Sequence, residues 1–81
     1  MVVERPWGER VLASRTKMGL TQKEFAKRLG CSKQIIYKWE QMLPRPYSVL
    51  ADWFIKVEAQ IDQMDDEEAR RWLGPIEPEE F

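Results

Sequence analysis

The stretch from 21 to 40 constrains the fold of this 81-residue chain more than any other part of it. It predicts two short helices that meet at Gly30, because glycine adopts the left-handed conformation that ends a helix without strain. Thr21 and Glu24 have the spacing of a capping box, which favours the start of a helix. Ser32 is a suitable N-cap for the helix that follows. We therefore expect two helices hinged at a tight turn.

The outward side of the second helix is polar, whereas Ile36 and Trp39 lie three residues apart on its inward side. The outward side chains are those of Lys33, Gln34, Tyr37 and Lys38. Two helices hinged in this way form a helix-turn-helix. The major groove of DNA admits one α-helix whose polar side chains read base edges, so the pattern favours DNA binding.

Charge is unevenly distributed along the chain. Residues 1–45 carry ten positive and four negative side chains, a net charge of +6, and residues 46–81 carry three positive and ten negative ones, a net charge of −7, which together give the total of −1. The local field, rather than the total charge, determines the attraction of phosphate groups. A run of charges is usually a solvated helix face, but here the basic half contains the helix-turn-helix. This coincidence favours a nucleic-acid interface in the first half.

The residue types argue against an enzyme or a metalloprotein. Histidine is absent, which removes the commonest general base and the commonest zinc ligand, so we expect no catalysis, no cofactor and no metal. Cys31 is the only cysteine, and a single thiol forms no intramolecular disulfide. No apolar run approaches the roughly 20 residues that a membrane span needs, and no signal-peptide pattern opens the chain. These features favour a cytoplasmic protein.

Apolar periodicity and turn residues divide the chain into four or five helices. A first helix is expected over about 6–18, ended by Gly19. Prolines at 44 and 46 interrupt the chain after the helix-turn-helix, and another helix is expected from about Tyr47. Its core-facing stripe consists of Leu50, Trp53, Phe54, Val57, Ile61 and Met64.

The C-terminal third allows two interpretations. Asp65 and Glu68 have a second capping-box spacing, which predicts a fifth helix over about 66–73. The alternative is one bent helix over 47–72. Ile55 lies off the apolar stripe, and we expect it to be exposed unless a partner covers it.

A skeleton of spaced residues runs through the first half: Val11, Arg15, Gly19-Leu20-Thr21-Gln22, Phe25-Ala26, Leu29-Gly30, Ile36 and Trp39-Glu40. It resembles the Cro/lambda-repressor-like (XRE-type) family of helix-turn-helix regulators over about 8–57. The resemblance implies an all-α fold, a compact bundle of four to five short helices. The chain departs from the family pattern at Ser14, where an apolar residue is usual, and at Met42-Leu43, where a glycine is usual. Its acidic C-terminal third matches no motif of the family.

The resemblance implies which side chains approach DNA. The candidate base-reading residues are Ser32, Lys33, Gln34, Tyr37 and Lys38. Lysine donates to O6 and N7 of guanine, and glutamine pairs with N6 and N7 of adenine. Gln22 corresponds to the family's phosphate-clamping glutamine at a helix N-terminus, and Lys23 and Arg45 are further phosphate-binding candidates. Arg15 and Glu40 are implied to form a structural ion pair.

These features predict a helix-turn-helix domain over 1–73, with the motif at 21–41 and a helical extension at 47–73, followed by an acidic mobile tail at 74–81. The resemblance implies a small prokaryotic or phage transcriptional regulator, a repressor, that binds double-stranded operator DNA as a homodimer. The candidate dimer interface consists of Ile55, Ile61 and Trp72. The alternative is an antitoxin or a protein-interaction adaptor that holds a protein partner through its acidic C-terminal segment.

Overall fold

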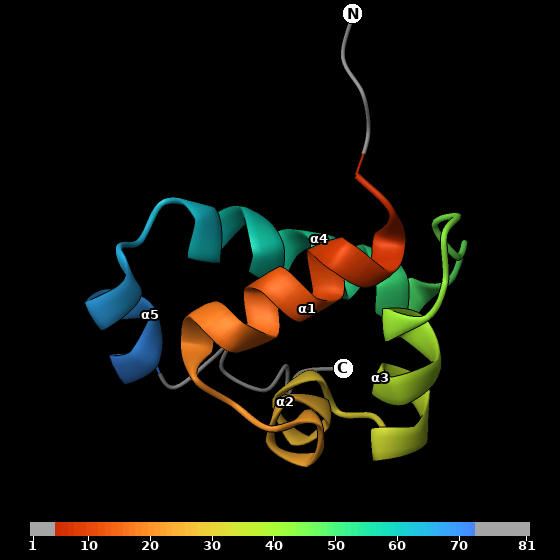
Figure 1. Cartoon of the computed structure of the whole chain (residues 1–81), viewed down its shortest axis with the longest axis horizontal. Coiled ribbons are helices and arrows are strands. Elements are labelled where there is room, and N and C mark those ends of the chain that lie inside the picture. The colour runs from red at the N-terminus through yellow and green to blue at the C-terminus, as the bar shows by residue number, and fades with distance from the viewer. Residues whose placement is uncertain (1–4, 73–81) are drawn as a thin grey trace, which may run out of the picture.

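Caps and turns set the bounds of five helices within residues 5–72, the part of the chain that the structure, a computed structural model, describes (Figure 1). The predicted all-helical architecture is confirmed, and these residues contain no strand. The helices are α1 (Trp7–Met18), α2 (Gln22–Leu29), α3 (Lys33–Glu40), α4 (Val49–Asp62) and α5 (Asp66–Arg71). The predicted tail at 74–81 lies outside the described residues.

The ends of α1 and α2 follow local sequence signals. Gly19 and Gly30 end these helices in the left-handed conformation, with φ angles of 72° and 80°. The Thr21 hydroxyl accepts a hydrogen bond from the Glu24 amide at 3.1 Å, and the Glu24 carboxylate accepts one from the Thr21 amide at 2.9 Å. The predicted capping box is therefore confirmed. Hydrogen bonds from the Thr21 amide and hydroxyl lower the pKa of Glu24 below its usual value.

Helix α4 begins two residues later than the sequence predicts. Its first residue is Val49 rather than Tyr47, because Ser48 takes the N-cap position in an extended conformation. The Ser48 hydroxyl accepts a hydrogen bond from the Ala51 amide at 3.1 Å. Residues 41–48 form the loop between α3 and α4, as the prolines predict.

The C-terminal third forms two helices, which excludes the single bent helix. Asp65 caps α5, and its carboxylate accepts a hydrogen bond from the Glu68 amide at 2.8 Å, so the second predicted capping box is also confirmed. Helix α5 ends at Arg71, before the predicted end at residue 73. Residue 73 itself lies outside the described residues.

Four aromatic rings form the centre of the core. Phe54 of α4 is fully buried, and its ring meets those of Trp7, Phe25 and Trp39 edge-to-face at centroid distances of 5.1, 6.1 and 6.1 Å. Trp7 and Trp39 also meet edge-to-face at 5.2 Å. Aromatic pairs favour this geometry because the positive edge of one ring lies against the negative face of the other. The cluster therefore joins α1, α2, α3 and α4 at one point.

A close backbone approach fixes the start of α1 against the end of α3. The amides of Trp7 and Gly8 donate hydrogen bonds to the carbonyls of Leu43 and Met42, at 3.0 and 2.8 Å. Gly8 is buried, and a methyl group added there would collide with the carbonyl of Glu40. Glycine is required at this position because the two backbones touch.

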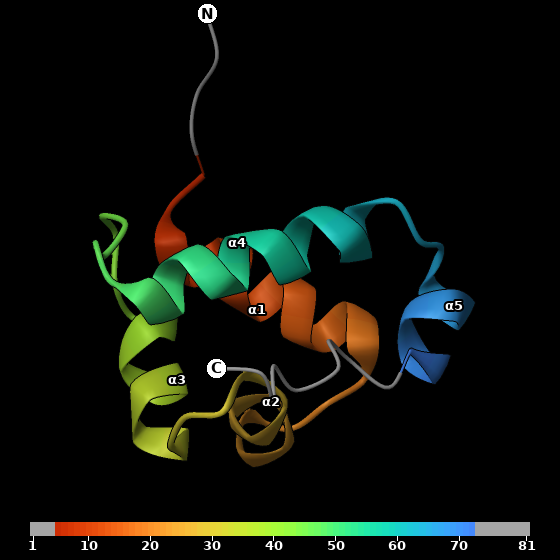
Figure 2. The same cartoon turned by 180° about the vertical axis from the view of Figure 1, so that it is seen from behind.

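The other end of the bundle is closed by α5, which packs against α1 (Figures 1 and 2). Arg28 of α2 donates a hydrogen bond to the carbonyl of Trp72 at 3.0 Å. Helices α1 and α4 lie side by side, and the Arg10 guanidinium donates to both oxygens of the buried Glu58 carboxylate at 3.0 and 2.5 Å. Both views place α5 and α3 at opposite ends of the molecule.

The aromatic cluster generates a stability prediction. We expect Phe54→Ala to lower the free energy of unfolding by about 3–5 kcal/mol, because it removes a fully buried ring and leaves a cavity among three others. Urea denaturation followed by tryptophan fluorescence measures the change. Val49→Ala, on the exposed side of the same helix, is the matched control and should shift stability by less than about 0.5 kcal/mol. Equal effects of the two changes would contradict this description of the core.

Candidate nucleic-acid interface

The outward face of α3 is open to solvent, whereas its inward face is buried. Ile36 is fully buried and Trp39 is 6% exposed, so the helix is held by one side only. The exposed side chains are the predicted base-reading set: Ser32, Lys33, Gln34, Tyr37 and Lys38. The helical period of 3.6 residues separates the two sets. The structure therefore gathers the five candidates on one accessible face, and their contact with DNA stays a prediction.

The turn between α2 and α3 is partly covered. Cys31 is half-buried, and its burial raises the pKa of the thiol. The residue packs against the core, as expected for a small apolar side chain. Ile35, at the border of the outward face, is also half-buried against the core.

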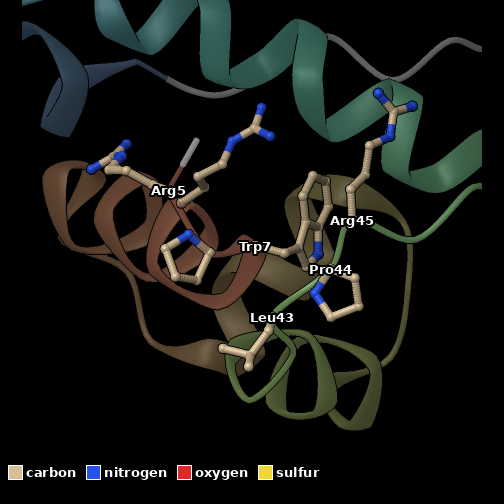
Figure 3. A pocket seen from close by; sticks show the side chains of 7 residues that line it. Arg5, Trp7, Leu43, Pro44 and Arg45 are labelled. Atoms are coloured by element: carbon tan, nitrogen blue, oxygen red, sulfur yellow. The ribbon is translucent and has the colours of Figure 1, made fainter. Parts of the chain in front are cut away.

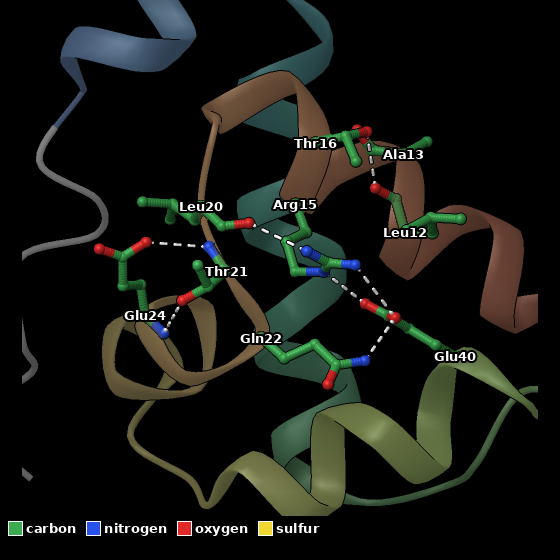
Figure 4. Close-up of polar contacts among 9 residues, drawn as sticks. All are labelled: Leu12, Ala13, Arg15, Thr16, Leu20, Thr21, Gln22, Glu24 and Glu40. Carbon is green, nitrogen blue, oxygen red and sulfur yellow. Dashed lines mark hydrogen bonds and ion pairs between the residues drawn. The ribbon is translucent and has the colours of Figure 1, made fainter.

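An ion pair between Arg15 and Glu40 joins α1 to α3 (Figure 4). The Arg15 guanidinium donates to the two carboxylate oxygens of Glu40 at 2.6 and 3.3 Å, as the family resemblance predicts. The same guanidinium donates to the Leu20 carbonyl at 3.0 Å. The side chains of Arg15 and Glu40 are only 16% and 11% exposed, so the pair is largely shielded from water.

Gln22 is part of the same network. Its side-chain nitrogen donates to the Glu40 carboxylate at 2.9 Å, and the residue is half-buried (Figure 4). An amide nitrogen carries two N–H donors, so this bond orients Gln22 and leaves a second donor for a phosphate. Gln22 is the first residue of α2, where the positive end of the helix dipole favours an anion. Lys23, the next residue, is exposed.

Arg45 lies apart from this network, in the loop between α3 and α4. It forms an ion pair with Asp52 of α4, donates to the Pro46 carbonyl at 3.3 Å, and stacks over the Tyr47 ring at 5.2 Å. These contacts fix Arg45 on the loop. Its guanidinium is already paired with a carboxylate, and its contact with phosphate stays a prediction.

A pocket of about 270 Å³ lies beside Arg45 (Figure 3). It is lined by Arg5, Pro6, Trp7, Arg10, Leu43, Pro44 and Arg45. Two of its three guanidiniums, those of Arg10 and Arg45, hold the carboxylates of Glu58 and Asp52. The indole N–H of Trp7 is buried without a hydrogen-bond partner among the described residues. The carboxylates offset most of the positive charge, so this pocket is a poor match for a strongly anionic ligand.

The three residues predicted to form a dimer interface are all covered to some degree within the single chain, and dimerisation itself stays a prediction. Ile61 is fully buried, because it lies one turn after Val57 on the core-facing stripe of α4 and packs into the core. Ile55, expected to be exposed, is half-buried against the core, and Trp72 is half-buried as well. Neighbouring helices of the same chain cover these side chains, so no partner is needed to do so.

Sequence reasoning did not single out several structural residues. Gly8 carried no local signal, because its role depends on the backbone of α3. The Arg10–Glu58 pair spans 48 positions and has no local signature. Among residues 5–72 no three histidine, cysteine or acidic side chains are grouped to hold a metal ion. No helix in this part of the chain is long and apolar enough to cross a membrane.

The comparison with known proteins gives one match. A family model described as Helix-turn-helix matches residues 11–46, from the middle of α1 to the loop after α3. The match contains the ion-pair network and the exposed face of α3. No curated protein and no solved structure matches the chain.

The network generates a stability prediction. We expect Glu40→Ala to lower the free energy of unfolding by about 2–4 kcal/mol, because it leaves a shielded guanidinium and an amide without their acceptor. Gln22→Ala removes a single hydrogen bond and should cost about 1 kcal/mol. Chemical denaturation measures both variants. A Glu40→Ala variant as stable as Gln22→Ala would show that the ion pair contributes nothing.

Proposed function

We propose that residues 11–46, which match the Helix-turn-helix family model, form a Cro/lambda-repressor-like (XRE-type) DNA-binding domain, and that the protein binds double-stranded DNA sequence-specifically with α3 in the major groove. The observation that supports the proposal is the exposure of a polar face on a helix whose opposite face is anchored in the core. A rigid helix of this kind fits the groove without rearrangement of the protein.

The chemistry of α3 supports base recognition. Lys33, Gln34 and Lys38 offer donors for guanine O6 and N7 and for the bidentate pattern of adenine. Tyr37, 56% exposed, offers a ring for a thymine methyl and a hydroxyl for a phosphate. Each good base contact discriminates by about 1–3 kcal/mol.

Phosphate binding by the start of α2 sets the register of α3 on the duplex. Gln22 is oriented by Glu40, which belongs to α3 itself, so one hydrogen bond couples the phosphate contact to the base-reading helix. Lys23 adds an exposed positive charge beside it. Phosphate contacts of this kind position a protein on DNA, whereas base contacts specify the sequence.

We propose further that two copies bind paired half-sites of an operator and that the protein is a prokaryotic or phage repressor acting in the cytoplasm. One module of this size buries limited surface on DNA, and pairing is the usual route to specificity. Repression follows if the bound copies block RNA polymerase, an inference by family analogy.

The exposed acidic side chains favour a second candidate function. Asp62, Asp65, Asp66, Glu67 and Glu68 are all exposed, and α5 lies at the opposite end of the molecule from α3 (Figures 1 and 2). An antitoxin or adaptor would hold a basic protein partner at this end. The two functions are compatible in space, because the acidic end does not cover the exposed face of α3.

Charge reversal on α3 tests DNA binding. We expect Lys33→Glu with Lys38→Glu to weaken binding at least about a hundredfold, because two cationic contacts become repulsive. Fluorescence anisotropy on random duplex at two salt concentrations measures the change, and wild-type affinity should fall steeply as salt rises. Lys56→Glu with Arg71→Glu, at exposed positions on α4 and α5, is the control with the same net charge. Equal loss in both double variants would contradict an interface on α3.

A separate variant tests sequence recognition. We expect Gln34→Ala to lose about 1–3 kcal/mol of discrimination at one base pair while its affinity for random duplex stays nearly unchanged, because the side chain is neutral. Selection of bound sequences from random duplexes, performed with wild type and variant, measures the preference at each position. Identical preferences would remove Gln34 from the base-reading set.

A further inference from the structure

We propose that the pocket beside Arg45 binds a small organic molecule that has one carboxylate and an apolar body. This pocket, here named the arginine pocket, is lined by Arg5, Arg10 and Arg45 and has a volume of about 270 Å³ (Figure 3). Its volume is just below the roughly 300–1,000 Å³ of ordinary ligand pockets, so it suits a ligand of few atoms. None of its lining residues belongs to the predicted base-reading set, and the proposal therefore adds a site apart from the exposed face of α3.

The charge of the arginine pocket matches that of one carboxylate. The guanidiniums of Arg10 and Arg45 are paired with the carboxylates of Glu58 and Asp52. Arg5 is exposed and has no ion pair with any other residue among 5–72. One positive charge is therefore left in the pocket, which balances a single negative charge but not the two charges of a phosphate dianion.

The start of α1 adds a second source of positive potential. Pro6 and Trp7, the N-cap and the first residue of this twelve-residue helix, both line the arginine pocket. No side chain caps this end of the helix through a hydrogen bond. The positive end of the helix dipole therefore lies at the pocket, where it favours an anion.

A buried donor in the wall of the arginine pocket lacks an acceptor. Trp7 is 1% exposed, and its indole nitrogen has no hydrogen-bond partner among the described residues. In Figure 3 this nitrogen lies on the side of the ring toward Pro44, another lining residue. Buried polar groups are almost always hydrogen-bonded, so an unpaired donor beside a pocket points to an acceptor that binds there. An oxygen of the ligand would supply this acceptor.

The rest of the wall is apolar and is held in place. Pro6, Leu43 and Pro44 have no polar side-chain group, so they favour the body of an organic ligand over water. The Trp7 amide donates to the Leu43 carbonyl at 3.0 Å, which fixes the two backbones that border the pocket. The side chain of Leu43 is 73% exposed and that of Arg5 is exposed, so both can rotate and widen the pocket toward the indole without a change in the core.

The experiment titrates the full chain with three probes. Benzoate has the proposed chemistry, benzamide has nearly the same shape without the charge, and inorganic phosphate has the charge without an apolar body. Nuclear magnetic resonance follows the indole N–H of Trp7, assigned among the four tryptophans. Arg5→Gln removes the unpaired charge at an exposed position. Arg71→Gln, at an exposed position on α5, is the control with the same chemical change.

We expect benzoate to shift the indole proton of Trp7 to higher frequency until saturation, because the N–H gains a hydrogen bond, and to bind at least about tenfold tighter than benzamide or phosphate. Arg5→Gln should weaken benzoate binding about threefold, and Arg71→Gln should leave it unchanged. Absence of a saturable shift, equal affinity for benzoate and either other probe, or equal effects of the two variants overturns the proposal. The test needs no DNA, so its outcome is independent of the proposed function.

Discussion

The ion pair between Arg15 and Glu40 is the interaction on which the arrangement of the first three helices depends. It joins α1 to α3, and its partners reach the turn before α2 through the Leu20 carbonyl and the start of α2 through Gln22. Removing one partner from such a shielded pair leaves a charge without its counterpart, which costs more than the pair contributes when intact. The orientation of α3 is thus set by one of its own residues.

Apolar packing in the core also holds the first three helices together. Phe54 of α4 contacts aromatic rings from α1, α2 and α3, so the fourth helix serves as the common support of the helix-turn-helix. Gly8 lets the start of α1 touch the end of α3, and the two amides there hold the loop that follows. Together these contacts anchor α3 along one side and leave its polar side exposed.

The charged side chains of α3 and α5 are also separated by the fold. The cationic side chains of α3 and the acidic ones of α5 lie at opposite ends of the molecule. The fold therefore separates the exposed lysines of α3 from the exposed acidic side chains around α5.

The sequence by itself determined the first three helices and their ends, but it placed the start of α4 two residues early and left the C-terminal third as one helix or two. The capping box of Thr21 and Glu24 and the left-handed conformation of Gly19 and Gly30 were predictable from the sequence. Caps and turns depend on residues within about four positions of one another. The exposure of the polar face of α3 was predictable from the helical period that separates it from Ile36 and Trp39. Only the tertiary structure decided that Ile55 is half-buried, that Gly8 meets α3, and that Tyr47 and Val49 stay uncovered. These outcomes depend on distances between residues far apart in the chain, and local spacing carries no information about such distances.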